Sequence, residues 1–249
     1  MDALEKIKER VIDYPTTITS EEIEYICRMY NSINTMTMNS ICGTKIDINL
    51  IEYNQKKIIK TKEELNELLR KICLSSSTGK WLLSIKGITP YLAAKCISLF
   101  NVNGKECATQ FLKYCGLSGQ STNFNKEAKS VVETIGNVFS RYGNYYRDLY
   151  TERLEYEKER NRSGEYVKIA EDYMMKQDTP TIDIVSFYSQ GILPPTHIEH
   201  RAKIWVEKIF VCHLFTQMYY SKYHKLPKRE REGGENNKFY FEPEVSYIQ

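Results

Sequence analysis

The chain has 249 residues, 41% of them hydrophobic and 27% charged, which is typical of a folded globular protein and excludes a disordered one. Its 35 Lys and Arg residues are nearly balanced by 32 Asp and Glu residues, so the net charge of +3 indicates no nucleic-acid partner by itself. No apolar run approaches the ~20 residues that cross a membrane. We therefore expect a cytoplasmic protein (in the host cytoplasm if it is viral) without a membrane partner.

The first region, residues 1–75, is predicted to be helical. A short amphipathic helix over residues 2–13 ends before a proline, because the residue that precedes proline disfavours helical dihedrals. Thr19–Glu22 and Thr61–Glu64 each have the form of a capping box, and apolar residues at helical spacing follow both. Residues 37–56 are ambiguous, and at most a small pair of strands is expected near residues 44–53. The predicted fold class is therefore all-α.

The second region, residues 76–224, is also predicted to be helical, and the small polar residues 75–79 mark the boundary before it. The expected helices are 90–100, 105–114 ended by Gly116, 127–160 with a break at 141–144, 164–176, and 197–223 opened by a capping box at Thr196–Glu199. Residues 225–249 form a tail that begins with the basic run Lys225, Lys228, Arg229 and Arg231. The run is a candidate phosphate contact, although charged tails are usually only solvated.

The stretch LLSIKGITPYLAAK, which starts at Leu82, resembles a helix–hairpin–helix element, a structure that binds the DNA backbone without reading sequence. Gly87 permits a tight turn, and a helix that starts at Pro90 presents free N–H groups to a phosphate. The site predicted here consists of Lys86, Gly87, Ile88 and Thr89, with Lys95 as a nearby positive charge. Thr89 stands where the usual hairpin has a second glycine. The alternative is a plain turn between two packed helices.

A wider resemblance covers about residues 80–223. The segments GITPYLAAKCISLF and FLKYCGLSGQS, followed by SVVETIGNVFSRYGNYYRDLYTERLEYEKER, resemble the C-terminal serine domain of the IS-one-ten-type insertion-sequence transposases. The last helix, PPTHIEHRAKIWVEKIFVCHLFTQMYY, is similar to the ending of transposase-like proteins found in viral genomes. The resemblance implies a DNA-binding, recombination-related domain.

Catalysis is less well indicated. The resemblance implies a nucleophilic serine soon after Gly116-Leu117, where Ser118 and Ser121 stand, but neither has the offset of the family's Ser-Gly pair, and a lone serine is weak without a base. The family's RuvC-like domain needs strands that present carboxylates to two metal ions. Asp47 and Glu52 lie in no such framework. Whether the chain is an enzyme stays open.

No metal or other cofactor is predicted. The seven cysteines include no Cys-x-x-Cys pair and are interpreted as core residues. His197, His200 and His213 have no diagnostic metal spacing and are interpreted as structural or capping residues. The 197–223 helix mixes basic and aromatic residues, which could stack on bases, but its amphipathic pattern favours core packing.

Three functions follow from these patterns. The first is a protein that binds the phosphate backbone of duplex or branched DNA and has no self-sufficient catalytic activity. Further copies of the same chain are also expected partners, in a homo-oligomer. The second is an active serine recombinase or transposase that uses Ser121 with a partner subunit or guide RNA. The third is a viral structural or interaction protein that has lost DNA binding.

Overall fold

The computed structural model describes residues 3–40, 48–118, 123–176 and 182–227. Within these ranges it contains α-helices, one 3-10 helix and no strand, so the predicted all-α class is confirmed. The elements are α1 (Ala3–Asp13), η1 (Pro15–Thr17), α2 (Ser20–Ser40), α3 (Ile48–Leu74), α4 (Ser77–Ser84), α5 (Pro90–Leu99), α6 (Thr109–Tyr114), α7 (Lys126–Phe139), α8 (Tyr145–Arg162), α9 (Val167–Lys176), α10 (Ile182–Ser189) and α11 (Pro195–Tyr223). The expected strand pair is wrong for residues 48–53, which begin α3, and residues 44–47 lie outside the described ranges.

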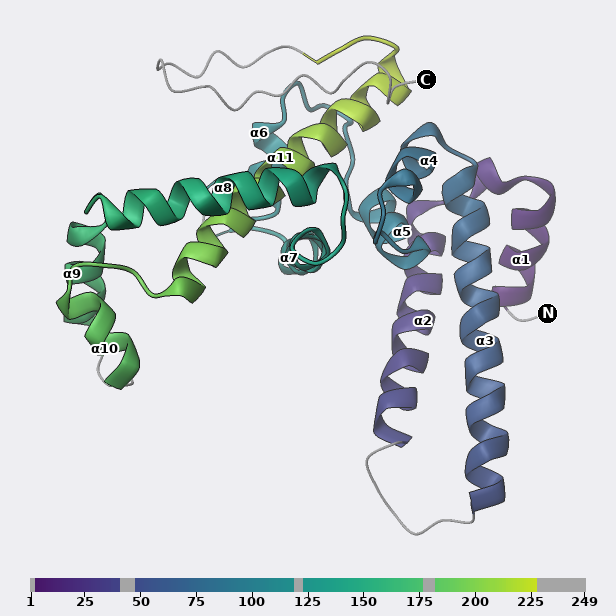
Figure 1. Cartoon of the computed structure of the whole chain (residues 1–249). Coiled ribbons are helices and arrows are strands. Elements are labelled where there is room, and N and C mark those ends of the chain that lie inside the picture. Colours follow the sequence, from purple (N-terminus) through teal and green to yellow (C-terminus); the bar gives the residue numbers. More distant parts are fainter. Residues whose placement is uncertain (1–2, 41–47, 119–122, 177–181, 228–249) are drawn as a thin grey trace.

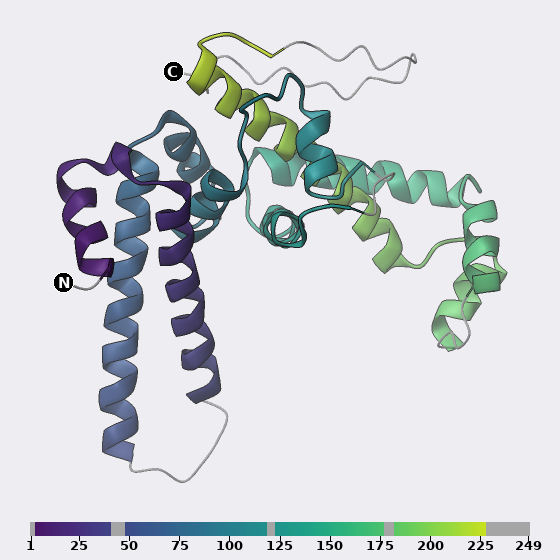
Figure 2. The ribbon, with the colours of Figure 1, turned by 180° about the vertical axis from the view of Figure 1, so that it is seen from behind.

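An N-terminal lobe consists of α1 to α5 (Figure 1). The long helices α2 and α3 run side by side, and α5 packs against both of them at one end of the pair (Figures 1 and 2). The predicted capping box at the start of α2 is confirmed. The Thr19 hydroxyl accepts a hydrogen bond from the Glu22 N–H at 3.3 Å, and the Glu22 carboxylate accepts one from the Thr19 N–H at 2.9 Å.

The second predicted capping box is wrong, because Thr61 lies inside α3. Its hydroxyl donates to the Lys57 carbonyl at 2.9 Å, which is how a threonine within a helix satisfies its hydroxyl. The boundary predicted at residues 75–79 is a tight corner between α3 and α4. The Ser76 hydroxyl caps α4 by accepting the Gly79 N–H at 3.0 Å, and a Cβ on Gly79 would lie only 2.0 Å from the Cys73 carbonyl oxygen.

A C-terminal lobe consists of α6 to α11 (Figure 1). The long helices α8 and α11 pack across each other, α7 packs against α11, and α9 and α10 form a hairpin at the far end. The break predicted at residues 141–144 is confirmed, since it separates α7 from α8. The capping box predicted at Thr196 is wrong: α11 begins at Pro195 without a side-chain cap. A search of the described residues finds no candidate membrane-spanning helix.

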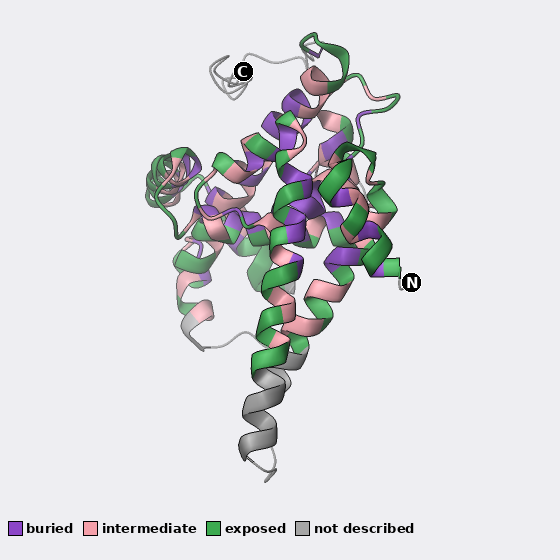
Figure 3. Ribbon diagram, turned by 90° about the vertical axis from the view of Figure 1, so that its right-hand side faces the viewer, coloured by how far each residue is buried: buried purple, intermediate pink, exposed green. Residues whose placement is uncertain are grey.

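One continuous core joins the two lobes. Its buried residues extend from Leu4 in α1 to Phe215 in α11, and Figure 3 shows buried segments gathered in the middle of the molecule. Trp81 of α4 stacks on Phe210 of α11 with ring centroids 6.0 Å apart. The predicted division at residues 75–76 therefore falls between two helices, α3 and α4, that share this core. A smaller second core lies beneath α9 and α10 and includes Tyr166 and Tyr188.

Candidate nucleic-acid interface

The turn between α4 and α5 is short and closed by its own backbone hydrogen bonds. The Ile85 N–H donates to the Leu82 carbonyl at 3.2 Å, and the Ile88 N–H donates to the Ile85 carbonyl at 3.0 Å. No acceptor in the described part of the chain takes the N–H of Lys86 or of Gly87. Since the Lys86 side chain is also exposed, the turn combines two unbonded amides with one ammonium group.

Gly87 allows this turn to pack directly against the C-terminal lobe. Its φ is +96°, a value that L side chains rarely adopt. A Cβ at this position would lie 2.5 Å from Val138 Cγ1 of α7 and 3.1 Å from a ring carbon of Tyr142. Both the backbone conformation and the close approach therefore require glycine here.

Thr89 is compatible with the turn although it replaces the second glycine of the hairpin pattern. Its φ of −81° is ordinary for any L residue, so the position does not need glycine. The hydroxyl accepts the Leu92 N–H at 3.3 Å and caps α5, and Pro90 occupies the first helical position. The hydroxyl retains a proton that it can donate to a phosphate oxygen.

Two of the residues predicted to bind DNA have structural roles instead. The Ile88 side chain is buried and its N–H is bonded within the turn, so neither faces a ligand. Lys95 is only 3% exposed and its ammonium is paired with Glu24 at 2.6 Å and with Glu127. Burial lowers the pKa of Lys95, but the hydrogen bonds that its ammonium donates to both carboxylates outweigh this and raise the pKa. The prediction that Lys95 supplies charge to a phosphate is thereby corrected.

The segment between α7 and α8, residues 140–144, lies against the α4–α5 turn. Asn144 Nδ2 donates to the Lys86 carbonyl at 2.9 Å, while its Oδ1 accepts the Arg147 N–H at 3.0 Å and caps α8. One side chain thus begins α8 and holds the turn. The break between α7 and α8 was predictable from the sequence. The contact of this segment with the α4–α5 turn was not, because the two bonded residues are 58 positions apart.

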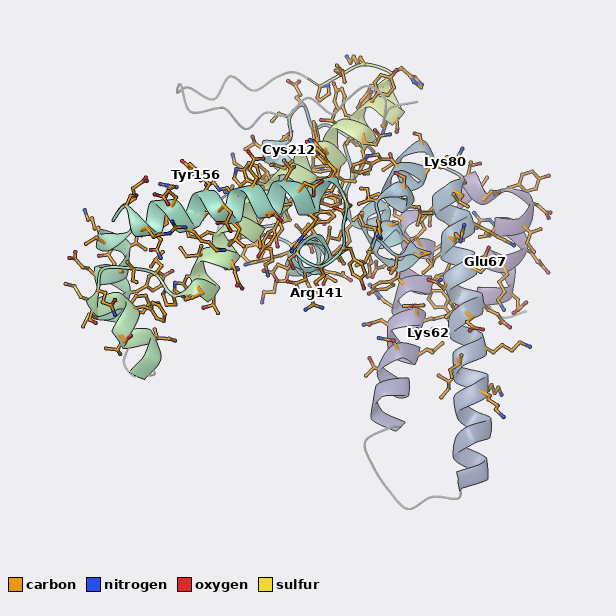
Figure 4. All side chains as sticks on the ribbon, in the orientation of Figure 1. Lys62, Glu67, Lys80, Arg141, Tyr156 and Cys212 are labelled. Atoms are coloured by element: carbon orange, nitrogen blue, oxygen red, sulfur yellow. The ribbon has the colours of Figure 1, made fainter. Side chains whose placement is uncertain are left out.

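Exposed cationic and aromatic residues belong to the two segments that form this contact, or follow directly after them. Lys86 and Arg141 are exposed, and neither forms an ion pair within the described ranges. Figure 4 labels Arg141 at the end of α7, where its side chain points away from the helices. Tyr142 and Tyr145 are 48% and 46% exposed. We call the five residues Lys86, Arg141, Tyr142, Asn144 and Tyr145 the junction surface.

Of the two candidate nucleophiles, Ser118 lies within the described residues. The Ser118 hydroxyl is buried and has no hydrogen-bond partner among the described residues, so no described group is placed to accept its proton. Ser121 lies outside the described residues, as does Asp47. Glu52 lies in α3, not on a strand.

The histidines have contacts typical of structural residues. The ring of His197 packs edge-on against Tyr173 with centroids 4.9 Å apart, and His213 Nδ1 lies 2.9 Å from the buried Tyr146 hydroxyl. Within the part of the chain that the structure describes, no three His, Cys, Asp or Glu side chains are grouped as metal ligands.

The basic–aromatic mixture of α11 belongs mainly to the core, as its amphipathic pattern predicted. Phe210 and Phe215 are fully buried, and Trp205 lies beneath the guanidinium of Arg153 at 5.2 Å. Of the predicted basic run, Lys225 is exposed, whereas Lys228 and the residues after it lie outside the described ranges.

Two buried carboxyl groups outside the junction surface, Glu157 and Glu207, differ in their hydrogen-bond partners. Glu157 accepts hydrogen bonds from Arg153 Nε at 2.9 Å, from Arg201 Nε at 3.0 Å and from the Tyr166 hydroxyl. Burial raises the pKa of Glu157, but these partners outweigh it and lower the pKa below its ordinary value. Glu207 is 1% exposed, and its Oε1 has no partner among the described residues, so burial raises its pKa to about 7.

No protein-family model, curated protein or solved structure matches this chain.

Proposed function

We propose that the chain is a DNA-binding protein that holds the phosphate backbone at the junction surface and has no self-sufficient catalytic activity. The observation that carries this proposal is the hydrogen bond from Asn144 to the Lys86 carbonyl. It joins the turn, whose Lys86 and Gly87 amides have no acceptor among the described residues, to the segment that carries Arg141. Groups suited to binding an anion are thereby brought together from both lobes. The sequence resemblance of residues 80–223 to a transposase domain supports the same class of ligand.

The proposed contacts are electrostatic and independent of base sequence. Lys86 and Arg141 are not neutralised by carboxylates within the described ranges, so a phosphate gains attraction without breaking an ion pair. Contacts of this type position a protein on DNA. Because each neutralised phosphate releases counterions, the affinity should fall steeply as salt rises, with a slope of about −0.9 per phosphate on a log–log plot for duplex DNA.

The proposal is tested by fluorescence-anisotropy titrations of duplex, single-stranded and four-way-junction DNA across a salt series. Lys86→Glu and Arg141→Glu should each weaken binding and reduce the salt slope by about 1. Lys168→Glu is the matched control, since it makes the same charge change at an exposed position on α9, at the far end of the C-terminal lobe.

Loss of binding in the two junction variants but not in the control supports the proposal. Equal effects of all three variants, or no salt-sensitive binding by the wild type, would exclude it. A substitution of Gly87 is unsuitable for this test, because the clash of its Cβ with Val138 would disturb the fold. Binding as a homo-oligomer in the cytoplasm belongs to the same proposal, and light scattering with and without DNA tests the oligomeric part.

A further inference from the structure

We infer that the junction surface prefers DNA with unpaired bases to intact duplex, and that Tyr142 and Tyr145 are the surfaces on which those bases stack. This inference rests on the proposed DNA-binding function and names the class of DNA that the same site takes. It depends on the position of the two tyrosines, the contacts that hold them, and the cations beside them.

The two tyrosine rings are exposed on the same segments as Lys86 and Arg141, or directly beside those segments. Tyr142 follows Arg141 directly, and its ring lies against the Gly87 backbone, next to Lys86. Tyr145 follows Asn144, the residue that bonds to the Lys86 carbonyl. Two rings, each about half exposed, therefore flank the point where the α4–α5 turn meets the α7–α8 segment.

Two other exposed tyrosines of the C-terminal lobe, Tyr156 and Tyr173, also have ring contacts within the protein. The ring of Tyr156 lies beneath Arg153 at 4.7 Å and Arg160 at 5.5 Å, and Tyr173 stacks on Tyr188 with centroids 5.8 Å apart. Exposure of a tyrosine alone would therefore not distinguish the junction surface. The junction surface is distinguished by exposed tyrosines that lie beside cations, Lys86 and Arg141, that form no ion pair in the described ranges.

The junction rings are held in place before any ligand arrives. Tyr142 is packed against the turn at Gly87, and Tyr145 meets Tyr146 edge-on at 5.4 Å and lies over the His213 ring at 6.3 Å. A tyrosine side chain has few rotatable bonds, so little further entropy is lost when a base stacks on it.

Unpaired bases fit this arrangement better than duplex DNA does. In a duplex the faces of the bases are covered by their neighbours, so an aromatic side chain reaches them only if the stack is opened. A single strand leaves its bases free to stack on aromatic rings while its phosphates follow positive charge. Lys86 and Arg141 supply that charge. Lys86 lies in the α4–α5 turn, which the Tyr142 ring contacts, and Arg141 directly precedes Tyr142.

The test compares an oligothymidylate of about 12 nucleotides, within the size range of known single-strand sites, with a duplex of the same length. Tyr142→Leu and Tyr145→Leu should each weaken oligothymidylate binding about fivefold or more and change duplex binding by less than about twofold. The corresponding Phe variants should keep the wild-type affinity, because they retain the ring. Tyr14→Leu, at an exposed position before η1, is the control and should have no effect.

The outcomes separate this inference from the proposed function. If the Leu variants weaken both DNAs equally or neither, while Lys86→Glu weakens both, the surface binds DNA but does not stack bases, and the inference fails alone. If Lys86→Glu also leaves both affinities unchanged, the proposed function fails as well. Thermal unfolding monitored by circular dichroism verifies that every variant compared is folded.

Discussion

At the scale of single residues, Glu207 is a buried carboxyl group whose Oε1 has no hydrogen-bond partner among the described residues. It lies on α11 against the backbone of α7, so close that a Cβ on Gly136 would be 2.2 Å from its Oε1. Burial raises its pKa and Glu133 adds to this, whereas Lys203 and Lys129 lower it by less. The glycine in α7 makes room for a carboxyl group that stays protonated at mildly acidic pH.

Replacement of Glu207 by Gln should change how stability depends on pH. The folded-state pKa of about 7 exceeds the ordinary glutamate pKa of 4.5. The free energy of unfolding therefore falls as the pH rises from 4.5 to 7, and this contribution does not change with pH outside that range. The loss amounts to about 3 kcal/mol. Urea unfolding between pH 4.5 and 8 should show wild type losing stability relative to Glu207→Gln. Parallel curves for the two proteins would contradict the buried position of this carboxyl, whose Oε1 has no hydrogen-bond partner among the described residues.

Gly87 allows the cost of a close contact to be separated from the cost of a left-handed backbone. Gly87→Ala introduces both, whereas Gly104→Ala introduces only the second, since Gly104 has φ +67° and nothing within 4 Å of an added Cβ. We expect a loss of about 1 kcal/mol at Gly104 and of about 2–4 kcal/mol at Gly87, measured by denaturant unfolding. Equal losses would mean that the turn moves away from Val138 at little cost.

At the scale of helices, Asn144 has two functions that can be separated. Asn144→Ala removes both the cap of α8 and the bond to the Lys86 carbonyl, and should cost about 1–2 kcal/mol. Asn144→Asp keeps an oxygen for the Arg147 N–H, which is favourable at a helix N-terminus, but cannot donate to a carbonyl when ionised. We expect Asp to recover most of the lost stability in thermal unfolding. If Asp is as harmful as Ala, the bond between the lobes matters more than the cap.

Helices that depend on local signals were predictable from the sequence. The Thr19 capping box, the start of α5 at Pro90 and the break before α8 are all governed by side chains that bond to nearby backbone or by the fixed φ of proline. The pattern at Thr61 was misleading because the same Thr-x-x-Glu spacing occurs inside a helix, where the hydroxyl bonds to the preceding turn. A four-residue motif does not show whether the helix has already begun.

At the scale of the whole molecule, helical periodicity predicted the all-α class, but the candidate site depends on contacts that periodicity does not determine. Lys95 was expected to be a free charge because its two carboxylate partners, Glu24 and Glu127, lie 71 and 32 positions away. The approach of Tyr142 to Gly87 likewise depends on how α7 packs against the N-terminal lobe. Such pairings are set by the packing of the two lobes and have no signature in either segment alone.

The junction surface draws its residues from both lobes, and the hydrogen bond between Asn144 and Lys86 crosses from one to the other. A ligand that binds only when both halves are in place is thermodynamically linked to their docking. At a ligand concentration 100 times its Kd, the docked arrangement would gain about 2.7 kcal/mol, a large fraction of the stability of a typical domain. Under the proposed function, DNA would add to the stability that the shared core already gives to the contact between the two lobes.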